Sequence, residues 1–151
     1  MIDVGSPFPE FTLADESGAE ISLATLKGSK AVIYFYPKDD TSGCTIEACE
    51  FRDALPSIAG VRVIGVSPDS SKSHAKFIGK FNLNFTLLAD TDHVLCEAAG
   101  VWAEKSMYGK KYMGVERTTF VLDEQGVVQH VFRKVKPQGH ADEVIAVLSG
   151  R

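Results

Sequence analysis

Residues 31–45 read Ala31-Val32-Ile33-Tyr34-Phe35-Tyr36-Pro37-Lys38-Asp39-Asp40-Thr41-Ser42-Gly43-Cys44-Thr45, and this stretch decides the fold. The apolar, β-branched and aromatic run 31–36 has no polar alternation, which predicts a strand buried on both faces. Pro37 ends this strand, because proline cannot donate to a sheet ladder. A loop follows, and from Cys44 to about residue 59 the apolar residues recur at roughly helical spacing. Pro56 is expected to kink or shorten that helix.

On both sides of this stretch, the chain alternates between strand and helix patterns. Strands are expected at 11–13, 20–23, 61–66, 85–89, 118–122 and 127–132, and helices at 68–81, 94–99 and 141–148. Buried strands separated by helices predict parallel pairing, and the turn at 123–126 predicts an antiparallel hairpin. Segment 107–114, rich in Gly, Lys and Tyr, is expected to be a loop. The expected fold class is α/β, with a mixed central sheet flanked by helices.

Length and charge narrow the class of protein. A chain of 151 residues that is 44% hydrophobic fits one domain with its own core, so 1–151 is taken as a single domain. The formal net charge of −4 argues against nucleic acid and anionic membranes as partners. No basic segment precedes an apolar run at the N-terminus, and no apolar stretch is long enough to cross a bilayer. The expected location is the cytoplasm.

The chain has three cysteines, Cys44, Cys49 and Cys96. In a reducing compartment, so small and odd a number argues against a structural disulfide framework and for buried, metal-binding or reactive thiols. Cys96 lies among apolar residues and is expected to be a buried, inert thiol. Zinc is disfavoured, since the first two cysteines are five residues apart and no histidine is near in sequence.

Cys44 is the candidate nucleophile, because it lies at the predicted N-terminus of a helix that follows a buried strand. The free N–H groups and the positive dipole end of a helix favour a thiolate. Acidic neighbours would oppose the thiolate, so the fold must supply a cation. Those neighbours are Asp39, Asp40, Glu47 and Glu50, and the candidate cations are Lys38, Arg52, Arg117 and Arg133.

Cys49 follows Cys44 by five residues, which on an ideal helix separates their Cα atoms by about 8 to 9 Å. A disulfide does not close much beyond about 7 Å, so a bond between them requires the first turns of the helix to unwind. The spacing is equally consistent with a small apolar core residue at position 49.

Residues 35–45 resemble the active-site segment of peroxiredoxins, in particular that of the bacterioferritin-comigratory, or Q-type, subgroup. The family pattern Pro-x-x-x-Thr-x-x-Cys is matched by Pro37, Thr41 and Cys44. The similarity spans nearly the whole chain and includes 115–120 (Val-Glu-Arg-Thr-Thr-Phe) and 133–141. One departure is Ser42, where the subgroup usually has proline.

The resemblance implies a thioredoxin-like fold and a thiol peroxidase that acts on hydrogen peroxide and organic hydroperoxides without cofactor or metal. By family match, Cys44 is the peroxidatic cysteine and Arg117 is the cation that faces it. Thr41 would hydrogen-bond the peroxide and the thiolate, and Pro37 would shield the sulfur. Cys49 would resolve the sulfenic acid as an intramolecular disulfide. Thioredoxin or a similar dithiol protein would reduce that disulfide, and the protein would be a monomer.

Two other functions remain open at this point. One is a thiol–disulfide oxidoreductase that acts on protein disulfides, although a Cys-x-x-Cys motif is absent from the sequence. The other is a redox sensor or holdase that needs only stoichiometric oxidation, whereas a peroxidase turns over with a reductant.

Overall fold

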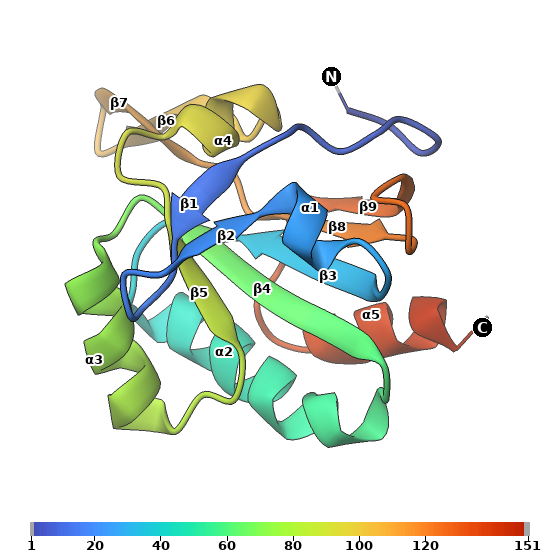
Figure 1. The fold of residues 1–151 in the computed structure, drawn as a ribbon. Helices are drawn as coiled ribbons and strands as arrows, with labels where there is room; N and C mark the ends of the chain where they lie inside the picture. Colours follow the sequence, from blue (N-terminus) through green and yellow to red (C-terminus); the bar gives the residue numbers. More distant parts are fainter. Residues whose placement is uncertain (1, 150–151) are drawn as a thin grey trace.

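The structure, a computed structural model, describes residues 2–149 (Figure 1). Its strands are β1 (Thr12–Ala14), β2 (Glu20–Ser22), β3 (Lys30–Phe35), β4 (Val61–Ser67), β5 (Thr86–Ala89), β6 (Trp102–Met107), β7 (Lys110–Val115), β8 (Thr118–Leu122) and β9 (Val128–Arg133). Its helices are α1 (Leu23–Leu26), α2 (Ser42–Ala54), α3 (Ser71–Phe81), α4 (Val94–Ala98) and α5 (His140–Leu148), with a 3₁₀ turn η1 (Leu55–Ser57) after α2.

The central sheet is mixed, in the order β2-β1-β5-β4-β3-β8-β9. Strand β3 pairs in parallel with β4, and β4 pairs in parallel with β5. The β8–β9 hairpin is antiparallel and adds to β3 through β8. The predicted α/β class and the mixed sheet are confirmed.

Strand β3 is buried on both faces, as predicted. Ile33 and Phe35 point into one apolar cluster, while Val32 and Tyr34 point into the other. Figure 1 shows α2, α3 and α5 below the sheet, and α1, α4 and the N-terminal segment above it. Each large apolar side chain buried in this way contributes roughly 1.5 to 3 kcal/mol, so β3 anchors both layers.

The prediction of a loop at 107–114 is wrong, because β6 and β7 form a separate two-stranded antiparallel sheet there. The two residues at its tip, Tyr108 and Gly109, both have positive φ, 53° and 79°. That is the conformation of a two-residue type I′ hairpin turn. Tyr-Gly is not one of the pairs that usually mark this turn, so the hairpin was missed.

Several element boundaries also differ from the prediction by one to five residues, and two of these differences have a clear local cause. The strand expected at 20–23 ends at Ser22, where reciprocal hydrogen bonds between Ser22 and Thr25 start the single turn of α1. The helix expected at 44–59 runs from 42 to 54 and gives way to the 3₁₀ turn η1 at Pro56. Pro56 therefore shortens the helix, as predicted.

The sheet register places the segment before β8 next to the end of β3. Phe35 pairs with Thr118 in the antiparallel β3–β8 ladder. Arg117, one residue earlier, therefore lies beside the start of the loop that leads to α2.

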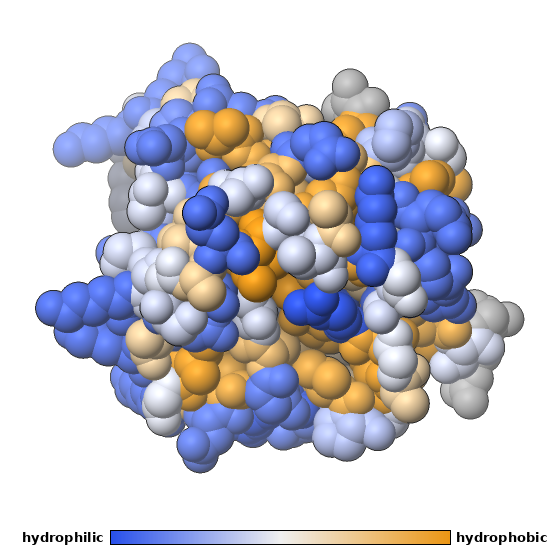
Figure 2. Space-filling model, in the orientation of Figure 1, coloured by the Kyte–Doolittle hydropathy of each residue, from blue (hydrophilic) through white to orange (hydrophobic). Residues whose placement is uncertain are grey.

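On the face seen in Figure 2, apolar side chains gather across the lower part, where hydrophilic side chains interrupt them. Within residues 2–149, no helix combines the length and apolar character needed to cross a bilayer.

Candidate active site

Cys44 is the third residue of α2, and Thr41 is the N-cap of that helix. The Cys44 side chain is buried, with 0% of the residue exposed. The first N–H groups of a helix lack intrahelical acceptors and form the positive end of its dipole. The predicted placement of this thiol at a helix N-terminus is therefore confirmed, with the helix starting two residues earlier than expected.

Arg117 is the cation that the fold brings to the sulfur. Its Nη2 donates a hydrogen bond to Cys44 Sγ at 3.0 Å. Gly43 makes room for this contact, since a Cβ atom at that position would lie 3.0 Å from Arg117 Nη2. Such a distance is tighter than ordinary side-chain packing allows, so a larger residue at position 43 would displace the guanidinium.

The other candidate cations are engaged elsewhere or exposed. Arg52 donates to the carbonyl oxygen of Phe81 at 2.6 Å, and Arg133 donates to that of Ile2 at 2.7 Å. Lys38 is exposed on the loop. Distance along the sequence did not distinguish these residues from Arg117, and only the family resemblance selected it.

Glu47 completes the charged group around the sulfur. Its Oε1 accepts a hydrogen bond from Arg117 Nη1 at 3.0 Å, and its side chain is 1% exposed. Its Oε2 has no hydrogen-bond partner among the described residues. Burial raises the pKa of Glu47 to about 7, and the ion pair with Arg117 opposes this rise. This role of Glu47 was not predicted from the sequence, although residues three apart on a helix share a face.

The remaining acidic neighbours of Cys44 turn away from the sulfur. Asp40 pairs with Lys80 at 2.8 Å on the surface. Glu50 accepts a hydrogen bond from the backbone N–H of Gly139 at 2.9 Å. Asp39 is buried against α3. Of the four carboxylates near Cys44 in the sequence, Glu47 is therefore the one that contacts Arg117.

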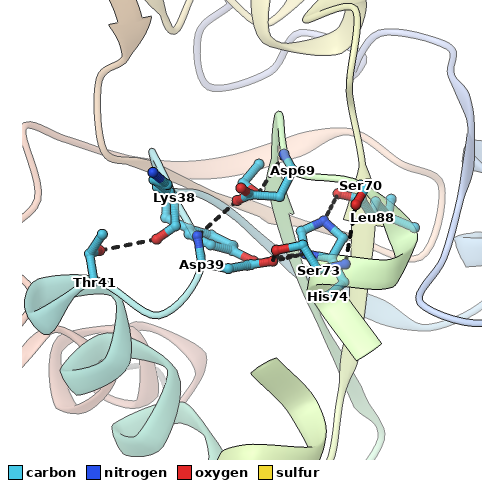
Figure 3. Close-up of polar contacts among 10 residues, drawn as sticks. Lys38, Asp39, Thr41, Asp69, Ser70, Ser73, His74 and Leu88 are labelled. Atoms are coloured by element: carbon cyan, nitrogen blue, oxygen red, sulfur yellow. Dashed lines mark hydrogen bonds and ion pairs between the residues drawn. The ribbon is translucent and has the colours of Figure 1, made fainter. Parts of the chain in front are cut away.

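Thr41 and Pro37 lie on the loop between β3 and α2. The Thr41 hydroxyl donates to the carbonyl oxygen of Lys38 at 3.0 Å, a contact that Figure 3 shows at the N-terminus of α2. Pro37 is half-buried directly after β3. Ser42, which stands in place of the usual proline, is the first residue of α2, so the helix begins there without it.

Cys49 and Cys96 are in different environments. Cys49 is half-buried on α2, and it is a free thiol like Cys44. The helix is continuous between these two cysteines, so a bond between them requires a change in α2. Cys96 is 0% exposed, and burial together with the neighbouring Asp90 carboxylate raises its pKa far above the ordinary thiol value. The predicted burial of the thiol at position 96 is confirmed, and its inertness stays a prediction.

Known proteins are similar to this chain in sequence and fold. The AhpC/TSA family model matches residues 4–131. A bcp protein of Coxiella burnetii is 53% identical over 97% of this chain and 99% of its own, and Peroxiredoxin Bcp of Bacillus subtilis is 46% identical over 97% and 95%. A solved structure of the bacterioferritin comigratory protein of Xanthomonas campestris is 45% identical and superposes with a TM-score of 0.87, covering 93% of this chain and 90% of that one. The chain therefore belongs to the AhpC/TSA family, in its Bcp, or Q-type, peroxiredoxin subgroup.

Proposed function

We propose that this protein reduces hydroperoxides at Cys44 and closes a disulfide from Cys44 to Cys49 in each cycle. The observation that carries the proposal is the hydrogen bond from Arg117 to the Cys44 sulfur at a helix N-terminus. A thiolate is the nucleophilic form of cysteine, and both features favour it over the neutral thiol.

The first step is a displacement at oxygen. The Cys44 thiolate attacks one peroxide oxygen, the S–O bond forms, the O–O bond breaks, and the leaving oxygen takes a proton to become water or an alcohol. Negative charge moves from sulfur to the leaving oxygen, and Arg117 offers several donors along that path. Arg117 is held for this purpose by its second contact, with Glu47.

Thr41 is assigned the role of binding the peroxide. Its hydroxyl hydrogen is already donated to the Lys38 carbonyl, so the expected hydrogen bond from Thr41 to the Cys44 thiolate is not made in this structure. The Thr41 oxygen therefore keeps lone pairs that accept a hydrogen bond from the O–H of a hydroperoxide. Pro37, at the start of the same loop, would shield the sulfur from water.

In the second step the Cys49 thiol attacks the sulfenic sulfur of Cys44, the S–S bond forms, and water leaves. The first turns of α2 must unwind for this step, because the helical spacing is too long for a disulfide. The residues after Cys49 are held from two sides. Glu50 binds the Gly139 N–H, and Arg52 binds the Phe81 carbonyl. We infer that unwinding is confined to residues 42–49.

The substrates and partners follow from the same chemistry. The Xanthomonas campestris relative is described by its alkyl peroxide reduction activity, and we propose alkyl hydroperoxides and hydrogen peroxide as substrates here. The reductant is proposed to be thioredoxin or a similar dithiol protein. The small, odd number of cysteines suits a reducing compartment, and on that ground we propose a cytoplasmic location. Every residue assigned a role comes from one chain, so a monomer suffices.

The test is peroxide consumption coupled to thioredoxin, thioredoxin reductase and a reduced nicotinamide cofactor. Cys44→Ser is expected to abolish turnover. Cys49→Ser is expected to oxidise once and then to stop cycling with thioredoxin. Cys96→Ser is the matched control and is expected to cycle at the wild-type rate, since Cys96 is buried away from the site. Normal cycling of Cys49→Ser would overturn the resolving role, and activity in Cys44→Ser would overturn the proposal.

A further inference from the structure

A buried polar network lies behind the loop that joins β3 to α2. At its centre are Asp39 and His74, whose side chains are 4% and 0% exposed. The Tyr36 hydroxyl donates to Asp39 Oδ1 at 2.5 Å, and the Ser73 hydroxyl donates to Asp39 Oδ2 at 2.8 Å. Figure 3 shows Asp39 reaching from the loop to Ser73 and His74 on α3. The reaction steps described above use neither Asp39 nor His74.

The contacts of His74 fix where its protons are. Its Nε2 lies 2.8 Å from the carbonyl oxygen of Leu88, which only accepts, so Nε2 carries a hydrogen. Its Nδ1 lies 2.7 Å from Asp39 Oδ2. A bare nitrogen lone pair and an ionised carboxylate oxygen repel each other at that distance. One proton therefore lies between Asp39 and His74.

Other charged groups face this pair from neighbouring elements. Asp69, after β4, accepts from the Asp39 backbone N–H at 2.8 Å and from the Ser67 hydroxyl at 2.6 Å. Burial raises the pKa of Glu16, in the turn between β1 and β2, and the charge on His74 opposes this rise. Asp69 and Glu16 therefore add further acidic groups beside the pair.

The network holds the backbone of the peroxide-binding loop. Asp40, next to Asp39, has a φ of 57°, a left-handed conformation that is uncommon for residues other than glycine, asparagine and aspartate. Thr41 follows directly and caps α2. The ion pair between Asp40 and Lys80 is solvent-exposed and so contributes little. The buried contacts of Asp39 are therefore the main link from this loop to α3, β4 and β5.

Resting on the function proposed above, we propose that Asp39 and His74 share one proton and together position the loop that presents Pro37 and Thr41 to the peroxide. They act through Thr41 and do not touch the reacting atoms. Asp39 precedes the segment that unwinds and His74 lies on α3, outside that segment, so the pair keeps the loop in place while α2 changes.

The first test measures two half-reactions separately in three variants: the oxidation of Cys44 by peroxide and the reduction of the disulfide. His74→Leu leaves the buried Asp39 carboxyl group without the imidazole that shares its proton, and the loop is expected to shift to solvate that group. A displacement of about 1 Å lowers the rate of reaction with peroxide roughly 10- to 100-fold. Reduction of the preformed disulfide by dithiothreitol is expected to stay at the wild-type rate. Adding Asp39→Asn to His74→Leu removes the unpaired charge and is expected to recover part of the lost peroxide rate.

Lys80→Ala is the control, since it removes the exposed contact between the same loop and α3, and wild-type rates are expected. If folded His74→Leu reacts with peroxide at the wild-type rate, the positioning role is wrong. If the double variant is no faster than His74→Leu, the effect is one of packing and the paired charge is not involved. If the wild-type protein itself fails to consume peroxide, the proposed function is wrong. The positioning role of Asp39 and His74 in the peroxide reaction then falls with it, whereas the shared proton is tested separately.

A second test observes the proton directly and does not depend on activity. Nitrogen-15 NMR of the wild-type protein is expected to show a hydrogen on Nε2 of His74 and a hydrogen-bonded proton at Nδ1. An unprotonated Nδ1 beside an ionised Asp39 would contradict the shared proton. Asp39, Asp69 and His74 also bring potential metal ligands within 4.8 Å of one another. Titration with Zn²⁺ alone is expected to leave the His74 signals unchanged, and stoichiometric binding there would make this a cation site instead.

Discussion

Arg117 Nη2 lies 3.0 Å from Cys44 Sγ, although 73 residues separate the two in the sequence. The antiparallel register of β3 and β8 produces this proximity, because Phe35 pairs with Thr118 and so brings Arg117 to the end of β3. Gly43 then leaves space for the guanidinium. The electrostatics of the thiol therefore depend on the sheet register, since its neighbours in sequence are mostly acidic.

Arg117→Lys is expected to keep a positive charge near the sulfur and to lose the two-sided contact with Cys44 and Glu47. An ammonium cannot reproduce the rigid fork of donors. The second-order rate of Cys44 oxidation by peroxide is expected to fall about 100-fold, as when one donor to a developing negative charge is lost. Stopped-flow fluorescence of the Cys44 reaction measures this. Arg133→Lys is the control, and equal rates in the two variants would contradict the role of Arg117.

Gly43→Ala is expected to move the guanidinium away from the sulfur, because the new Cβ would lie 3.0 Å from Arg117 Nη2 and 3.3 Å from Pro137 Cγ. A shift of this kind is expected to lower the peroxide rate roughly tenfold. Gly79→Ala is the matched control, since a Cβ at that position of α3 meets nothing within 4 Å. This control is expected to keep the wild-type rate and to gain about 0.5 to 1 kcal/mol in stability. An unchanged rate of Cys44 oxidation by peroxide in Gly43→Ala would show that the reaction does not depend on the exact position of the Arg117 guanidinium.

The sequence pattern predicted the parts of this fold that depend on local signals. The unbroken apolar run of β3 indicated burial on both faces, and Pro56 indicated the end of α2. The β6–β7 hairpin was missed, because its strands alternate weakly and its turn uses Tyr108 with a positive φ. A side chain in a left-handed conformation leaves no reliable mark in the sequence.

Like the fold, the candidate site was predictable from the sequence only in part. Cys44 was found from its position at a helix N-terminus, whereas selecting Arg117 required the family resemblance, because the contact depends on sheet register. Glu47 was counted as an opposing charge, and the structure shows it as the partner of Arg117. Asp39 was counted in the same way, but it points into a buried network with His74. Charge counts along a chain do not show which way a side chain points.

Disulfide formation is expected to unfold only the first part of α2. The contacts of Glu50 with Gly139 and of Arg52 with Phe81 hold the helix after Cys49. Hydrogen exchange with mass spectrometry, on reduced and oxidised protein, is expected to show lost protection in peptides covering 42–49 and retained protection in 50–54. Cys49→Ser treated with peroxide is the control, since it forms the sulfenic acid without the disulfide. Lost protection across 50–54 as well would show that these anchors do not limit the unwinding.

Glu47 is expected to make stability depend on pH between about 4.5 and 7. Burial raises its pKa in the folded protein to about 7, from an ordinary value of 4.5. Between these values the native state binds more protons than the unfolded chain, so the free energy of unfolding falls as pH rises and levels off above pH 7. A shift of this size corresponds to roughly 3 kcal/mol. Glu47→Gln keeps a side-chain oxygen for Arg117 and removes the titratable carboxyl group. In urea unfolding at pH 5, 6, 7 and 8, the free energy of unfolding of the variant is expected to increase relative to that of the wild type as pH rises. Glu104→Gln, exposed on β6, is the control, and a pH-independent difference between Glu47→Gln and wild type would mean that Glu47 does not titrate in this range.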